Sequence, residues 1–78
     1  MGLREIVARN LRRLRRSRGL SQEELADRAG INRNYVGMLE REENAATVDM
    51  LEKLAEVLDV EPIEFFKRPS REAGHTKR

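Results

Sequence analysis

The fold of this chain is decided by the stretch SQEELADRAGINRNYVGMLE, residues 21–40. Ser21 and Glu24 have the spacing of a capping box, in which the serine hydroxyl accepts from the Glu24 amide and the Glu24 carboxylate accepts from the Ser21 amide. A helix therefore begins here. Gly30 ends it after about two turns, because glycine adopts the left-handed backbone conformation at low cost. Asn32 is expected to cap a second helix.

The second helix of this stretch, called the recognition helix below, has two different sides. At about 100° per residue, Val36, Leu39 and Glu40 fall together on the side that faces the protein interior. The other side is left for a partner and carries Asn34, Gly37, Met38 and Arg41. Helix pairs joined at a steep angle by a glycine-containing turn place the second helix in the major groove of DNA. The pattern therefore predicts a DNA-reading surface on this helix.

Six residues of the stretch stand where the Cro/CI-type (XRE) helix-turn-helix family has its defining residues, namely Gln22, Ala26, Gly30, Ile31, Val36 and Leu39. The chain resembles this family from about Arg4 to Phe66. The resemblance implies an all-α, five-helix, lambda-repressor-like DNA-binding domain in which helices 2 and 3 form the helix-turn-helix. Within the family, the short chain and residues 33–41 look like the small controller-type regulators found beside restriction-modification genes and on mobile elements.

The other helices are predicted from apolar periodicity and from caps. The first helix has one apolar face, formed by Leu3, Ile6, Val7, Leu11 and Leu14. Thr47 caps a fourth helix, whose core stripe consists of Leu51, Leu54, Ala55 and Leu58. Pro62 fits the first position of a short fifth helix that ends at Phe66. We expect residues 1–67 to form one domain and the polar residues 68–78 to be a disordered tail.

Composition excludes several function classes. The 78 residues suffice for one small domain. The absence of cysteine excludes a disulfide framework and a thiolate zinc site, and suits a reducing cytoplasm. No apolar run approaches the roughly 20 residues of a membrane span. The only histidine, His75, lies in the tail, so we expect no metal site and no His-dependent catalytic triad. The sequence also indicates no cofactor and no small-molecule ligand.

The net charge of +2 conceals a strong asymmetry along the chain. Residues 1–20 carry seven Arg against one Glu, residues 21–64 carry four basic against twelve acidic residues, and residues 65–78 carry five basic residues against one acidic residue. A basic first helix supplies the sequence-independent attraction to phosphate that a DNA-binding protein needs. The acidic residues 21–64 do not supply such an attraction.

Four residues of the recognition helix are candidates for reading base edges, namely Arg33, Asn34, Gly37 and Met38. Arg33 and Asn34 stand at the helix start and carry paired donors or acceptors suited to guanine and adenine edges. Met38 lies one turn later and either meets a thymine methyl or packs at the domain edge. Gly37 costs about 1 kcal/mol relative to Ala inside a helix. Its presence indicates either a close approach to DNA or simple tolerance.

Five residues are candidates for phosphate contacts, namely Gln22, Asn32, Tyr35, Arg41 and Asn44. Tyr35 either reaches a phosphate with its hydroxyl or covers the core. The resemblance implies that Gln22 contacts a phosphate and braces the recognition helix. It also implies that Arg15 of the first helix forms a structural ion pair with Glu40. The loop of residues 42–46 departs from the family pattern, because two carboxylates, Glu42 and Glu43, oppose phosphate there.

These residues predict a dimeric transcriptional regulator that binds double-stranded DNA and represses or autoregulates a nearby promoter. Surplus apolar residues predict a two-fold homodimer interface, namely Met50, Val57, Ile63 and Phe66. The alternative is an antitoxin or anti-activator that uses the same fold to sequester a partner protein. A toxin encoded by the neighbouring gene would favour the antitoxin role, and a restriction enzyme encoded there would favour the controller-type regulator. No constellation of residues supports an enzyme.

Overall fold

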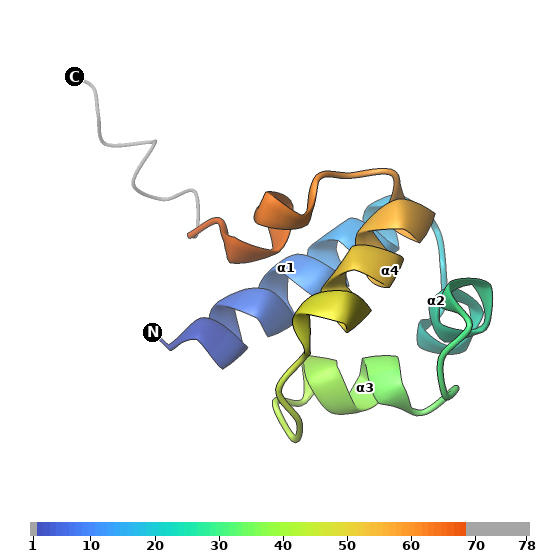
Figure 1. The fold of residues 1–78 in the computed structure, drawn as a ribbon, viewed down its shortest axis with the longest axis horizontal. Coiled ribbons are helices and arrows are strands. Elements are labelled where there is room, and N and C mark those ends of the chain that lie inside the picture. The colour runs from blue at the N-terminus through green and yellow to red at the C-terminus, as the bar shows by residue number, and fades with distance from the viewer. Residues whose placement is uncertain (1, 69–78) are drawn as a thin grey trace.

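A computed structural model describes residues 2–68, which form four α-helices and one 3-10 helix (Figure 1). The α-helices are α1 (Leu3–Ser17), α2 (Gln22–Ala29), α3 (Tyr35–Glu40) and α4 (Val48–Leu58). The 3-10 helix η1 spans Pro62–Phe66. The described residues contain no strand, which confirms the all-helical class.

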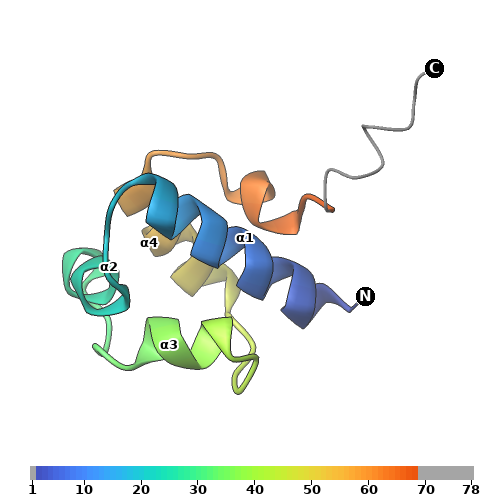
Figure 2. The same cartoon turned by 180° about the vertical axis from the view of Figure 1, so that it is seen from behind.

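The helices pack around one apolar core that leaves α3 at an edge of the molecule. α1 packs against α3 and η1, and α2 packs against α3 and α4. The interior is filled by fully buried side chains from every element, including Leu11, Leu25, Val36, Leu54 and Phe65. In both Figure 1 and Figure 2, α3 lies along the lower edge, below α1 and α4. One side of α3 is therefore held by the core while the other remains accessible.

The first half of the helix-turn-helix has the caps that the sequence predicts. The Glu24 amide donates to Ser21 Oγ at 3.0 Å, and the Ser21 amide donates to Glu24 Oε1 at 2.8 Å. α2 ends at Ala29 and is capped by Gly30, whose φ of 72° lies in the left-handed region. The amide of Ile31 then donates to the carbonyl of Ala26, which completes the turn toward α3.

The start of the recognition helix differs from the prediction. α3 begins at Tyr35, with Asn34 at its N-cap, so Asn32 does not cap the helix. Asn32 Oδ1 instead accepts from the Asn34 amide at 2.8 Å, and the Asn32 carbonyl accepts from the Tyr35 amide at 3.0 Å. The side chain of Asn32 thus closes a turn before the helix, as asparagine does in loops. Arg33 lies in this turn.

The expected fifth helix is a 3-10 helix and not an α-helix. Its five residues begin with Pro62, and the Glu64 amide donates to the Glu61 carbonyl three residues back. Such short segments adopt the tighter 3-10 winding readily. Its C-terminal carbonyls find a partner in α1, because Asn10 Nδ2 donates to the carbonyls of Phe65 and Lys67 at 2.9 and 2.7 Å.

Part of the predicted organisation lies outside the described residues. Of the tail predicted at residues 68–78, only Arg68 is described, and His75 is not. No helix within residues 2–68 is both long and apolar enough to cross a membrane.

Two helices end on left-handed residues that are not glycine. Glu42 follows α3 with a φ of 62°, and Asp59 follows α4 with a φ of 57°. After α3, the amides of Glu42 and Glu43 donate to the carbonyls of Leu39 and Met38, which is the Schellman pattern of a helix end. A glutamate in this conformation is strained, whereas aspartate tolerates it better.

We therefore predict that Glu42→Gly stabilises the domain. Glycine relieves the strain of the left-handed backbone, which stabilises the folded domain. Glycine also has more conformational freedom in the unfolded chain, which offsets part of this gain. The net effect should be a rise of about 0.5–1 kcal/mol in the free energy of unfolding. Urea unfolding at neutral pH measures the change. Asp59→Gly is the matched comparison and should gain less. A loss of stability in Glu42→Gly would contradict the assignment of strain to this position.

Candidate nucleic-acid interface

A shallow hollow of about 350 Å³ lies over the accessible side of α3. It is formed by the start of α2, the turn before α3, the outer face of α3 and the loop that follows. Its lining consists of Gln22, Glu23, Arg33, Asn34, Gly37, Met38, Arg41 and Glu43. All four candidate base readers lie there, together with two of the candidate phosphate contacts.

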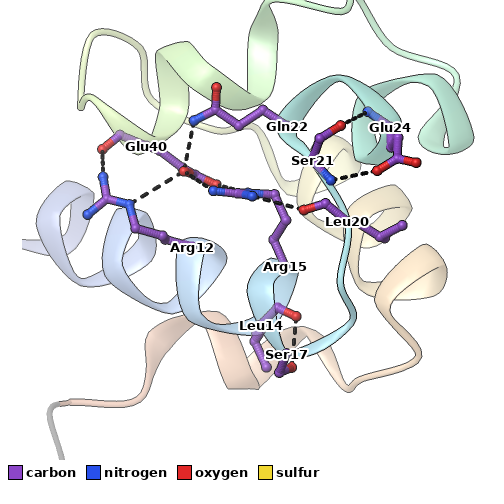
Figure 3. Close-up of polar contacts among 9 residues, drawn as sticks. All are labelled: Arg12, Leu14, Arg15, Ser17, Leu20, Ser21, Gln22, Glu24 and Glu40. Atoms are coloured by element: carbon purple, nitrogen blue, oxygen red, sulfur yellow. Dashed lines mark hydrogen bonds and ion pairs between the residues drawn. The ribbon is translucent and has the colours of Figure 1, made fainter.

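The buried carboxylate of Glu40 connects this surface to the rest of the molecule (Figure 3). Arg15 Nε donates to Glu40 Oε2 at 2.7 Å and Arg15 Nη2 donates to Oε1 at 3.0 Å, so the expected ion pair is present. Gln22 Nε2 also donates to Oε1, at 2.9 Å. The Glu40 side chain is only 1% exposed. One carboxylate therefore links α1, α2 and α3.

Arg12 takes part in the same network, a role that was not predicted from the sequence. Its Nη2 donates to the Glu40 carbonyl at 3.0 Å, and its Nε lies 3.5 Å from Glu40 Oε1. A signal for this role was present, since Arg12 precedes Arg15 by three residues and shares its side of α1. The carbonyl contact supplies a partner at the C-terminal end of α3, where helix carbonyls lack intrahelical partners.

The Glu40 carboxyl has a pKa below its ordinary value of 4.5. Burial raises this pKa, because the charged form loses water. Hydrogen bonds from Arg15 and Gln22, with the positive charges of Arg15 and Arg12, lower it by more. The carboxylate is therefore charged and fully partnered at neutral pH.

Gly37 is buried beneath two side chains of the hollow. A Cβ atom at this position would lie 3.0 Å from Arg41 Nη1 and 3.0 Å from Gln22 Oε1. Such distances are too short for ordinary contacts, so a side chain here would displace one of the two polar ends. The glycine thus makes room for Gln22 and Arg41, a role that neither sequence interpretation included.

Both arginines of the hollow are paired with a carboxylate. Arg41 Nε donates to Glu43 Oε2 at 2.8 Å, and Arg33 Nη2 lies 3.4 Å from Glu23 Oε1. The hydrogen bond between Arg41 and Glu43 raises the pKa of the guanidinium and lowers that of the carboxyl. Glu43, expected only to oppose phosphate, is thus a partner of a candidate phosphate contact.

The remaining candidates lie around the hollow and do not line it. Tyr35 is half-buried against the core, and its hydroxyl donates to the Ala45 carbonyl at a long 3.5 Å. Asn32 is exposed in the turn before α3, and Asn44 is half-buried in the loop after it. Met38 is half-buried within the hollow.

The four residues expected at a dimer interface differ in exposure. Met50 and Val57 are half-buried and pack against the core of their own chain. Ile63 and Phe66 of η1 are 67% and 41% exposed. Val48, which was not singled out from the sequence, is 79% exposed at the start of α4.

The helix-turn-helix family model HTH_3 matches residues 11–65. The chain belongs to this family. It is 42% identical over 64 residues to the uncharacterized HTH-type transcriptional regulator y4dJ of Sinorhizobium fredii, a match that covers 82% of this chain and 83% of that protein. The restriction-modification controller protein C.AhdI of Aeromonas hydrophila has a crystal structure with a TM-score of 0.77 and 43% identity to this chain, covering 81% of this chain and 96% of that one.

The crystal structure of the hypothetical transcription factor NHTF from Neisseria has a TM-score of 0.87 and 33% identity to this chain. The match covers 96% of this chain and 86% of the NHTF chain. The predicted membership of the XRE family is confirmed by these similarities. This helix-turn-helix protein is a DNA-binding transcriptional regulator, which is not a class of enzyme.

Removal of the Glu40 charge should destabilise the domain in a pH-dependent way. Glu40→Gln leaves Arg15 buried without a counter-charge, at a cost of about 3 kcal/mol at pH 7. Because the folded pKa of Glu40 is depressed, its contribution is fully present above about pH 4.5 and is lost as pH falls through the folded pKa.

Urea unfolding of wild type and variant between pH 7 and pH 3 measures this difference, which should shrink toward the acid end. Glu52→Gln, an exposed carboxylate on α4, is the control and should change stability by less than about 0.5 kcal/mol. A difference that stays constant down to pH 3 would contradict the assigned role of the charge.

Proposed function

We propose that this regulator binds an inverted-repeat operator as a homodimer and represses or autoregulates a nearby promoter. The observation that carries the proposal is the hollow on α3, where the side chains suited to base edges and to phosphate lie together. Arg33, Asn34 and Met38 are proposed to read bases, and Gly37 makes room for Gln22 and Arg41 beside them. The similarity to a restriction-modification controller protein supports a regulatory role at a promoter.

The proposed phosphate contacts surround the base readers on several elements and consist of Gln22, Asn32, Tyr35, Arg41 and Asn44. Phosphate contacts fix register and orientation, while base-edge contacts carry sequence information. Gln22 is the best supported of these residues. Its side-chain Nε2 donates to Glu40 Oε1 at 2.9 Å, which fixes the side chain. It also lies at the start of α2, where the backbone amides of a helix favour anions.

The proposed dimer joins the surfaces formed by Met50, Val57, Ile63 and Phe66. The exposure of Ile63 and Phe66 supports this, since a small domain gains stability by burying more apolar surface. One helix-turn-helix also reads only a few base pairs. A two-fold dimer would place the two recognition helices about 34 Å apart. This distance is one helical turn of DNA, so the centres of the two half-sites should lie one turn apart.

Arg33→Ala should relax base preference at one position of each half-site by about 1–3 kcal/mol, because a bidentate base contact discriminates by that amount. Gln22→Ala should instead weaken binding by a similar factor on the operator and on each of its single-base variants, because α3 keeps the same register on all of them. Titration of both variants against duplexes with single-base changes in a selected operator measures the difference. An equal loss on every duplex for Arg33→Ala would assign it to phosphate and not to a base.

Phe66→Glu should convert the dimer into a monomer with much weaker operator binding, because a charge would be buried in the apolar seam. Sedimentation at micromolar concentration and operator titration measure the two effects. Val48→Glu is the matched control, since it places the same charge on another exposed apolar residue and should stay dimeric. A monomeric wild type, or full operator affinity in Phe66→Glu, would refute this assignment of the interface.

A further inference from the structure

The guanidinium of Arg41 is held by two contacts at the end of the recognition helix. Its Nε and Nη2 donate to Glu43 Oε2 and Oε1 at 2.8 and 3.3 Å. Its Nη1 lies over Gly37, where a Cβ atom would come within 3.0 Å. Within residues 2–68, Nη1 donates no hydrogen bond. One edge of the guanidinium is therefore fixed while the opposite edge is available.

The position of Glu43 is set by the backbone. The left-handed conformation of Glu42 reverses the chain after α3, and the Glu43 amide donates to the Met38 carbonyl at 2.9 Å. This turn brings the Glu43 carboxylate back beside Arg41. The strain at Glu42 thus accompanies a defined placement of the acid, as strained residues often do near binding surfaces.

Arg41 shares the space above Gly37 with Gln22. A Cβ atom on Gly37 would also come within 3.0 Å of Gln22 Oε1, so both side chains use the room that the glycine leaves. Gln22 is fixed from the other side by its bond to Glu40. Two polar ends from α2 and from the end of α3 are therefore assembled next to each other before any DNA is bound.

We propose that Glu43 is a positioning residue that presents the Nη1 edge of Arg41, beside Gln22, to a phosphate of the operator backbone. This inference rests on the proposed DNA-reading role of α3. A long arginine side chain loses much rotamer freedom when it binds, and a partner that holds it in advance reduces that loss. The phosphate meets this edge only when α3 is seated in register, so the benefit is confined to the operator complex.

The opposite role for Glu43 makes a different prediction. If Glu43 is only a negative charge near DNA, its removal strengthens binding to every duplex by the same factor, because attraction to phosphate is independent of sequence. If it positions Arg41, its removal lowers the ratio of operator affinity to random-duplex affinity. The ratio separates the two roles, since a uniform charge effect cancels in it.

The test compares Glu43→Ala with Glu42→Gln in the full chain, using the duplex that wild type selects from random DNA and a random duplex of equal length. Both variants remove one exposed carboxylate from the same loop. We expect the affinity ratio to fall about threefold to tenfold in Glu43→Ala, the cost of ordering one long side chain. Glu42→Gln should keep the wild-type ratio, because it removes the charge of Glu42 without shortening the side chain at this left-handed position. In an Arg41→Ala background, Glu43→Ala should leave the ratio unchanged.

A second measurement needs no DNA. Nitrogen-15 relaxation should show the Arg41 Nε–H ordered in wild type and mobile in Glu43→Ala. Equal gains on operator and random duplex in Glu43→Ala, or an Arg41 Nε–H that is equally mobile in both proteins, would overturn the proposal. A wild type that prefers no duplex would instead refute the proposed function, and the relaxation measurement would still decide whether Glu43 positions Arg41.

Discussion

The buried carboxylate of Glu40 forms the interaction on which the geometry of the candidate DNA-binding face depends. It accepts from Arg15 of α1 and Gln22 of α2 while standing at the last residue of α3. Loss of any of these partners would leave a buried charge or a buried donor without a partner. The resulting loss in folding free energy is larger than the contribution of an exposed ion pair. The angle between α2 and α3 is therefore fixed by a charged contact as well as by apolar packing.

Charge counting along the sequence overstates how many arginines are available to DNA. Arg15 is neutralised by Glu40 inside the protein, and Arg12 also contacts it. Arg33 and Arg41 on the candidate face each have a carboxylate partner. The hollow on α3 is thus close to neutral. The DNA-binding role that we propose for this hollow therefore depends on the arrangement of its hydrogen-bond donors more than on its net charge.

Helix positions and caps were predictable because they follow from local chemistry. The Ser21 capping box and the left-handed Gly30 each need only residues close in sequence. The turn at Asn32 was mispredicted because asparagine closes a turn and caps a helix by the same kind of hydrogen bond. The reason for Gly37 was not accessible from the sequence, since it depends on side chains from α2 and from the end of α3 meeting above it.

The recognition helix has only six residues, fewer than an isolated helix needs to be stable in water. Its conformation must come from its surroundings, namely the buried Val36 and Leu39, the turn closed by Asn32 and the Glu40 network. A helix held in this way tolerates Gly37, because its stability depends little on intrinsic helix propensity. The residue that weakens the isolated helix is thus the one that lets Gln22 and Arg41 approach its surface.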